Sequence, residues 1–113
     1  MGANYGRYTF RGNGGDEPMS DTKARLEEFR SSIDNLDAAL VFLLSERFKL
    51  TKKVGEFKRD HDLPPGDPGR EEVMVARLRA LAEQSRLDPD FAERLIRFII
   101  EEVIRNHDKI RGA

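Results

Sequence analysis

The basic residues with the most informative spacing are Arg30, Arg47 and Lys58. On one α-helix, Arg47 and Lys58 would lie within about 20° of each other and roughly 16 Å apart along the axis. Two long side chains at this spacing can close on one small ligand between them. Arg30 would lie about 25 Å from Arg47 and about 100° round the helix, so it cannot serve the same ligand from the same chain. In an antiparallel dimer it could reach the partner's site.

These cations have a simpler interpretation when each is taken alone. A cation beside an apolar stripe must be paired or must face a ligand, because an unpaired buried charge is costly. A single arginine or lysine is nevertheless more typical of a solvated or salt-bridged surface, where ion pairs are frequent and contribute little. Spacing alone therefore leaves a binding site and a charged helix surface both open.

The helix that must carry these cations is predicted from about Thr22 to Asp60. It ends before residues 63–69 (LPPGDPG), where three prolines and two glycines prevent its continuation. Residues 1–20 hold five of the nine glycines and show no helical period, so we predict a flexible extension before a domain of residues 21–113. The apolar stripe of the long helix, at spacings of three, four and seven, comprises Phe29, Ile33, Leu36, Leu40, Leu43, Leu44, Val54 and Phe57.

Two shorter helices are predicted after this loop. The first covers Arg70 to about Ser85 and has Glu71 in its first turn, where the helix dipole favours an anion. The second begins at Asp88-Pro89, an N-cap followed by proline at the first helical position, and runs to about Lys109. Its predicted apolar stripe comprises Phe91, Leu95, Phe98, Ile99, Val103 and Ile110.

The length of the first helix determines the predicted architecture. About 38 residues at about 1.5 Å each extend for about 57 Å, whereas a compact domain of this size has a radius of gyration of only about 13 Å. Two helices of about 16 and 21 residues cannot cover such a stripe, so its remainder should pack against another chain. We therefore predict an all-α fold, a three-helix subunit with one long N-terminal helix, in a homodimer with antiparallel helices.

Composition excludes several classes of function. Lys and Arg total 20 against 21 Asp and Glu, which argues against general affinity for nucleic acid. There is no cysteine, and His61 and His107 make no convincing zinc site, so we expect no structural metal. No apolar run approaches the roughly 20 residues that span a bilayer, and the N-terminus lacks a secretory signal, so we expect a cytoplasmic protein without a membrane partner.

The chain resembles the AroQ-type chorismate mutases over about residues 26–110, without a gap. Four runs carry the resemblance, and they agree in residue type and spacing at seven separated positions: residues 30–37 (RSSIDNLD), 43–47 (LLSER), 54–58 (VGEFK) and 67–71 (DPGRE). The resemblance implies an intertwined dimer of three-helix subunits. It also implies an isomerase of aromatic amino acid biosynthesis that converts chorismate to prephenate without a cofactor.

The implied reaction is a [3,3] rearrangement that needs no nucleophile, acid or base. Catalysis would come from binding the chair-like conformer of the substrate and from electrostatic preorganisation. By similarity, Arg47 and the partner's Arg30 hold the substrate carboxylates. Lys58 donates to the ether oxygen as the C–O bond breaks.

The resemblance assigns roles to three further residues at the start of the second helix. Glu71 would accept from the ring hydroxyl, Arg70 would lie beside the ring carboxylate, and the loop at Asp67 would contribute mainly through its backbone. Taken alone, Glu71 is more typical of a first-turn residue that interacts with the helix dipole.

Two positions depart from the family pattern. Val103 stands where a serine often contacts a carboxylate, so one hydroxyl contact is absent. His107 stands one turn later, where glutamine or glutamate usually donates to the ether oxygen. A neutral imidazole can donate from one nitrogen, and an imidazolium would stabilise developing negative charge better. The alternative is a histidine that interacts with the negative end of the last helix.

Other functions on the same scaffold stay open. Arg30, Arg47 and Lys58 would equally serve a mutase of 4-amino-4-deoxychorismate or a lyase that removes pyruvate from isochorismate, and Glu71 fits a hydroxyl or an amine. A non-enzymatic helical dimerisation module is the alternative of a different class. Some family members are activated by another enzyme of the aromatic pathway, and the sequence leaves such a regulatory partner open.

Overall fold

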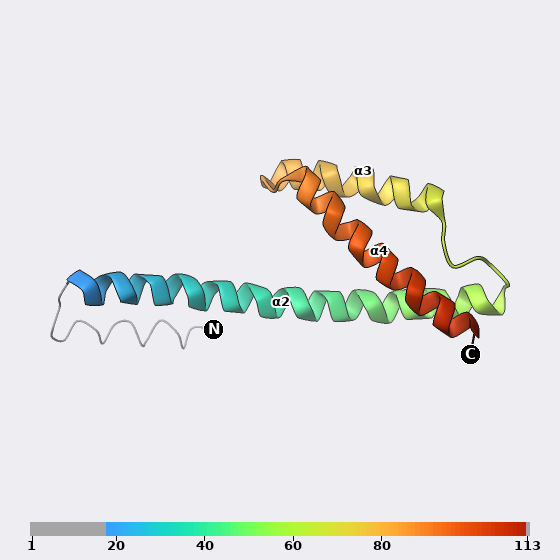
Figure 1. Cartoon of the computed structure of the whole chain (residues 1–113), viewed down its shortest axis with the longest axis horizontal. Coiled ribbons are helices and arrows are strands. Elements are labelled where there is room, and N and C mark those ends of the chain that lie inside the picture. Colours follow the sequence, from blue (N-terminus) through green and yellow to red (C-terminus); the bar gives the residue numbers. More distant parts are fainter. Residues whose placement is uncertain (1–17, 113) are drawn as a thin grey trace. The chain divides into compact units, whose positions relative to one another are not determined.

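The computed structural model describes residues 18–112, which form three helices, α2 (Pro18–Asp60), α3 (Pro68–Ser85) and α4 (Pro89–Gly112) (Figure 1). No strand occurs within this range, so the all-α prediction with one long first helix is confirmed. Helix α2 begins at Pro18 rather than at about Thr22, because proline suits the first turn of a helix. Residues 18–20 of the predicted extension are therefore helical, and residues 1–17 lie outside the described part.

Both shorter helices begin at an aspartate that caps the first turn. Asp67 Oδ1 accepts a hydrogen bond from the backbone N–H of Arg70 at 3.1 Å, and Asp88 Oδ1 accepts from that of Asp90 at 2.9 Å. Each aspartate is followed by a proline, which has no N–H to leave unpaired. The cap predicted at Asp88 is confirmed. These caps fix where α3 and α4 start.

Helix α2 ends in a Schellman motif, in which two N–H groups beyond the helix bond back to its last carbonyls. The N–H of Leu63 donates to the carbonyl of Lys58 at 2.8 Å, and that of Asp62 donates to the carbonyl of Arg59 at 3.2 Å. Asp62 occupies the left-handed position with φ 57°, which glycine usually fills. Helix α3 ends in the same way, with Arg86 at φ 65°.

The chain divides into two units, Met1–Glu46 and Arg47–Ala113. In the described part of the first unit, α2 has no other helix of that unit to cover it. Its predicted apolar stripe is exposed there, with Phe29 at 57%, Ile33 at 53%, Leu36 at 69%, Leu40 at 52% and Leu43 at 67%.

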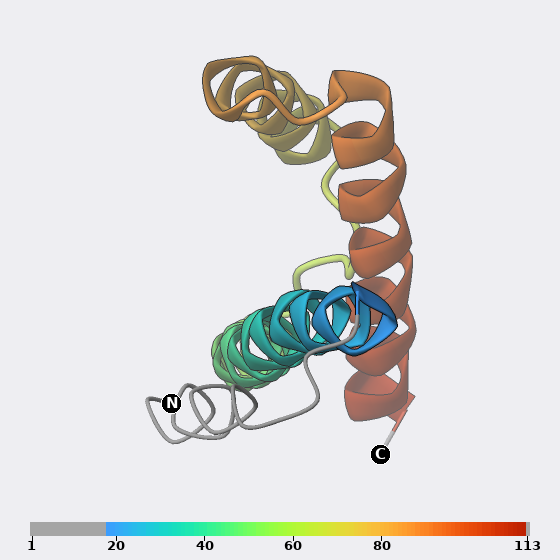
Figure 2. The ribbon, with the colours of Figure 1, turned by 90° about the vertical axis from the view of Figure 1, so that its left-hand side faces the viewer.

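The core of the second unit lies between α3 and α4, which Figure 2 shows side by side where a short turn joins them. Val75, Ile96 and Ile100 are its buried residues. Three residues of the predicted apolar stripe of α4 are exposed within the chain, Phe91 by 43%, Leu95 by 41% and Phe98 by 65%. The face that α4 buries is offset by one residue, and its buried residues are Ala92, Ile96, Ile100 and His107.

Helix α4 meets the last turns of α2 at Gly55. A Cβ atom at this position would lie 2.6 Å from Cδ2 of His107 and 3.0 Å from Cδ1 of Ile110. Distances this short leave no room for any side chain, so glycine permits the two helices to approach. The end of α4 is thereby packed against the part of α2 that carries Lys58.

A charged network joins α3 and α4 outside the core. Arg79 contacts Asp90 and Glu93, and Arg97 contacts Glu93 and Glu72. Hydrogen bonding from Arg97, helped by Arg79, lowers the pKa of the Glu93 carboxyl. Within residues 18–112, none of the helices has an apolar stretch long enough to span a membrane.

Candidate functional site

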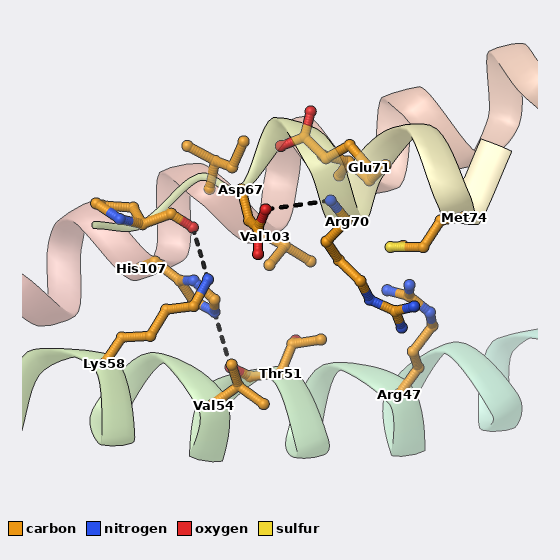
Figure 3. A pocket seen from close by; sticks show the side chains of 13 residues that line it. Arg47, Thr51, Val54, Lys58, Asp67, Arg70, Glu71, Met74, Val103 and His107 are labelled. Carbon is orange, nitrogen blue, oxygen red and sulfur yellow. Dashed lines mark hydrogen bonds between the residues drawn. The ribbon is translucent and has the colours of Figure 1, made fainter. Parts of the chain in front are cut away.

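One pocket in the second unit gathers side chains from α2, the α2–α3 loop, α3 and α4 (Figure 3). Seven of the eight site residues predicted from the sequence line this pocket. They are Arg47, Lys58, Asp67, Arg70, Glu71, Val103 and His107. The eighth, Arg30, belongs to the first unit and does not line it.

One face of α2 forms the floor of the pocket. Arg47, Thr51, Val54 and Lys58 follow each other at intervals of four, three and four residues, which places them on one side of a helix. Of these four residues, only the two cations were predicted site residues. Thr51 and Val54 lie on the same helical face, so the period that related Arg47 to Lys58 could also have identified them.

Arg47 brings an unsatisfied donor into the pocket. Its Nη1 is buried and has no hydrogen-bond partner within residues 18–112. A buried N–H group of a cation that lacks an acceptor is costly, so this position calls for an anionic ligand. Figure 3 shows the guanidinium of Arg70 directed from α3 into the same space between α2 and α3.

Lys58 lies at the other end of this face, beside the loop. Its Nζ donates to the carbonyl oxygen of Pro65 at 3.0 Å, as drawn in Figure 3. An ammonium has three N–H donors, and this bond uses one of them. Lys58 is therefore oriented by the loop and keeps donors for a ligand.

The loop and the first turn of α3 supply the acidic side of the pocket. Asp67 directs one carboxylate oxygen to the N–H of Arg70, so it acts as a helix cap. Glu71 is half-buried, and its Oε2 lies 3.9 Å from where a Cβ on Gly66 would be. This carboxylate is available to accept from a hydroxyl or an amine of a ligand.

His107 is a buried polar residue of the pocket, with 4% of its surface exposed. Its Nε2 donates to the carbonyl oxygen of Thr51 at 2.8 Å, because a carbonyl oxygen can only accept. Its Nδ1 is also buried and has no partner within residues 18–112. Nδ1 is thus a bare acceptor when the ring is neutral and a donor only when the ring is charged.

The α4 wall of the pocket is otherwise apolar. Val103 lies one turn before His107 and lines the pocket without a side-chain hydrogen-bonding group, at the position where the family often has serine. Met74, Ile100 and Ile104 complete this wall. These three were not predicted as site residues, because apolar residues at helical spacing equally indicate a core.

The arrangement suits a small anion with one hydrogen-bond donor. Arg47, Lys58 and Arg70 provide three positive charges against the carboxylates of Asp67 and Glu71. One of those carboxylates is engaged in capping α3. The pocket can therefore orient a ligand that carries negative charge toward α2 and a hydroxyl or amine toward Glu71.

Comparison with known proteins points to one family. The family model described as chorismate mutase type II matches residues 29–108. The chain is 32% identical over 77 residues to the chorismate mutase of Methanocaldococcus jannaschii, which covers 68% of this chain and 78% of that protein.

Two further relatives carry different names. A bifunctional chorismate mutase/prephenate dehydratase from Buchnera aphidicola subsp. Schizaphis graminum is 34% identical over 89 residues, 79% of this chain but 23% of the relative. The chain thus spans about a quarter of the length of this bifunctional relative. The 4-amino-4-deoxychorismate mutase of Streptomyces pristinaespiralis is 32% identical over 84 residues, 74% of this chain and 65% of the relative.

Proposed function

Because the chain belongs to the chorismate mutase type II family, we propose that it rearranges chorismate to prephenate in this pocket. The observation that best supports the proposal is the buried Nη1 of Arg47, which has no hydrogen-bond partner among residues 18–112 and belongs to a pocket with two further cations and an opposing carboxylate. Chorismate is a dianion with one ring hydroxyl, so its charges match these groups.

The rearrangement passes through a cyclic transition state in which one C–O bond breaks while one C–C bond forms. No proton is transferred and no covalent intermediate with the protein forms, so residues act through position and charge. Arg47 binds one carboxylate of the substrate. Lys58, already oriented by the Pro65 carbonyl, donates to the ether oxygen as negative charge develops there.

The first turn of α3 orients the ring. Glu71 accepts a hydrogen bond from the ring hydroxyl, and Arg70 lies beside the ring carboxylate. Asp67 contributes by fixing the start of α3 and by the backbone of its loop, since one of its carboxylate oxygens already accepts from the N–H of Arg70.

His107 takes the position of the second donor to the ether oxygen. Because Nε2 is bonded to Thr51, the group left for the ligand is Nδ1, and it donates only from the imidazolium. Val103 supplies no hydroxyl on the same wall, so His107 is the one polar side chain that α4 offers among the residues lining this pocket.

We further propose that the functional unit is a homodimer in which Arg30 of the partner subunit completes the pocket. The exposed apolar stripe of α2 supports this proposal, since contiguous exposed apolar side chains usually mark an interface. Within the chain, Arg30 is exposed and absent from the pocket lining. A partner enzyme of aromatic biosynthesis that activates the dimer remains a prediction from the resemblance.

The substrate is tested by incubating the purified protein separately with chorismate, 4-amino-4-deoxychorismate and isochorismate. We expect prephenate from chorismate as the fastest reaction. The amino analogue is the second candidate substrate, because the chain is similar to the 4-amino-4-deoxychorismate mutase of Streptomyces pristinaespiralis. Faster turnover of this analogue than of chorismate would make it the substrate. Release of pyruvate from isochorismate as the main reaction would indicate a lyase. The absence of turnover of all three, together with no binding of a transition-state analogue, would favour a non-enzymatic dimerisation module.

A further inference from the structure

The end of α4, residues 107–112, contacts both α2 and the α2–α3 loop. His107 and Ile110 pack on Gly55 of α2. Arg111, one turn after His107, extends to the loop instead: its Nη1 donates to the carbonyl oxygen of Leu63 and its Nη2 donates to Asp62 Oδ1 at 3.0 Å. The two arms of one guanidinium thus hold two consecutive residues of the loop.

The residue held by this guanidinium has a strained backbone. Asp62 has a positive φ of 57°, a left-handed conformation that is unfavourable for a residue with a side chain. Aspartate tolerates it better than most residues but less well than glycine. The ion pair with Arg111 and the bond to the next carbonyl both favour this turn.

The turn at Asp62 sets the path of the loop that orients Lys58. Three residues after Asp62, the carbonyl of Pro65 accepts from Lys58 Nζ. Arg111 therefore holds the first residues of the segment whose later carbonyl orients Lys58.

We propose that Arg111 is a positioning residue of the mutase site, which acts through the turn at Asp62 and the Pro65 carbonyl without touching the substrate. The expected effect on kcat/KM rests on the proposed function. The expected effect on the turn at Asp62 rests on the contacts of Arg111 alone. The Asp62 side chain is 93% exposed and that of Arg111 41%, so the ion pair itself contributes little to stability. Its effect lies in the geometry of the loop.

The test compares Arg111→Ala with Arg105→Ala, a matched control on the same helix. Arg105 pairs with Glu102 within α4 and does not line the pocket. Two quantities are measured for each variant: kcat/KM with chorismate, and hydrogen exchange at the Leu63 amide in the ligand-free protein. That amide forms the Schellman bond to Lys58, so its exchange reports on the turn without any need for activity.

We expect Arg111→Ala to accelerate exchange at Leu63 and to lower kcat/KM about fivefold, the upper scale of a partly exposed ion pair. Arg105→Ala should change neither quantity. Adding Asp62→Gly to Arg111→Ala should restore both, because glycine adopts the left-handed conformation without a holding contact. In a Lys58→Ala background, Arg111→Ala should cause little further loss of kcat/KM, since both substitutions act on the same donor.

Two results would overturn the proposal. One is unchanged exchange at Leu63 in Arg111→Ala. The other is a loss of kcat/KM that Asp62→Gly does not reverse, or that is equally large in the Lys58→Ala background. Either outcome would mean that Arg111 does not act through the turn and Lys58. If the unmodified protein turns over no chorismate, the proposed function fails, while the exchange measurement still decides whether Arg111 holds the loop.

Discussion

The side chain of His107 donates from Nε2 to the carbonyl oxygen of Thr51, 2.8 Å away, and so joins α4 to α2 beside the pocket. This bond determines what the ring can offer a ligand. Only Nδ1 remains, and it has no partner within residues 18–112. A neutral His107 would therefore present a lone pair to the ether oxygen, whereas the charged ring would present a donor.

The first prediction follows from this tautomer. Glutamine carries an amide donor that needs no added proton, so we expect His107→Gln to retain substantial activity. We expect His107→Ala to lower kcat, because the α4 wall of the pocket would then offer the ether oxygen no donor. Steady-state kinetics of the two variants test this. If His107→Ala leaves kcat unaltered, His107 only joins the helices.

Lys58 should matter more for turnover than for binding. Its ammonium stabilises charge that develops on the ether oxygen only in the transition state, so Lys58→Ala should lower kcat by about 10² or more with a smaller rise in KM. Steady-state kinetics measure both constants. Lys53→Ala is the control, because Lys53 is on the same helix but exposed and outside the pocket. An unchanged kcat in Lys58→Ala would remove Lys58 from the mechanism.

Gly55 should tolerate no side chain. An added Cβ would lie 2.6 Å from the His107 ring, so Gly55→Ala must push α4 away from α2 at a cost of about 1 to 3 kcal/mol. For a domain of this size we expect Tm to fall by roughly 4 °C or more. Gly66→Ala is the matched control, since its Cβ would meet only ordinary contacts at 3.8 and 3.9 Å. Equal melting temperatures for the two variants, measured by calorimetry, would refute the close packing.

The charged network between α3 and α4 predicts a loss of stability in acid. Arg97 and Arg79 lower the pKa of Glu93 below its ordinary value of 4.5, so the folded chain binds this proton less readily than the unfolded chain. The contribution of Glu93 is therefore complete above about pH 4.5 and is lost as the pH falls through the lowered pKa. Urea unfolding at pH 7 and in steps below pH 4.5 should show a steeper decline for the unmodified chain than for Glu93→Gln. Parallel declines would mean that the network contributes nothing.

Much of the fold could be predicted from the sequence because its signals are local. The prolines and aspartates at the starts of α3 and α4, and the helical period of α2, placed those elements within a few residues. The ends of α2 and α3 were predicted at Asp60 and about Ser85 and lie there, although the left-handed residues that close them are Asp62 and Arg86 instead of glycine. Phe91, Leu95 and Phe98 of the predicted α4 stripe are exposed within the chain, because apolar periodicity does not distinguish a face covered by the same chain from one left open for a partner.

The site was predicted in residue types more completely than in geometry. Spacing related Arg47 to Lys58, and the resemblance added Asp67, Arg70, Glu71 and the α4 pair. Neither the spacing nor the resemblance could reveal that the carbonyl of Pro65 accepts from Lys58 or that the carbonyl of Thr51 accepts from His107 Nε2. Both are backbone acceptors, and a backbone carbonyl has no signature in sequence because every residue carries one.

Complementation between two inactive variants tests the central claim most directly, which is that one chain's Arg47 and the partner's Arg30 complete a single chorismate site. Arg30→Ala and Arg47→Ala homodimers should each be inactive, and mixing them should place both arginines in one of the two sites of each heterodimer. With equal amounts and random exchange, about a quarter of all sites are intact, so we expect about a quarter of the normal rate of prephenate formation. Subunit exchange is verified in parallel by mass spectrometry of the mixed dimers. No recovery despite complete exchange would contradict the shared site.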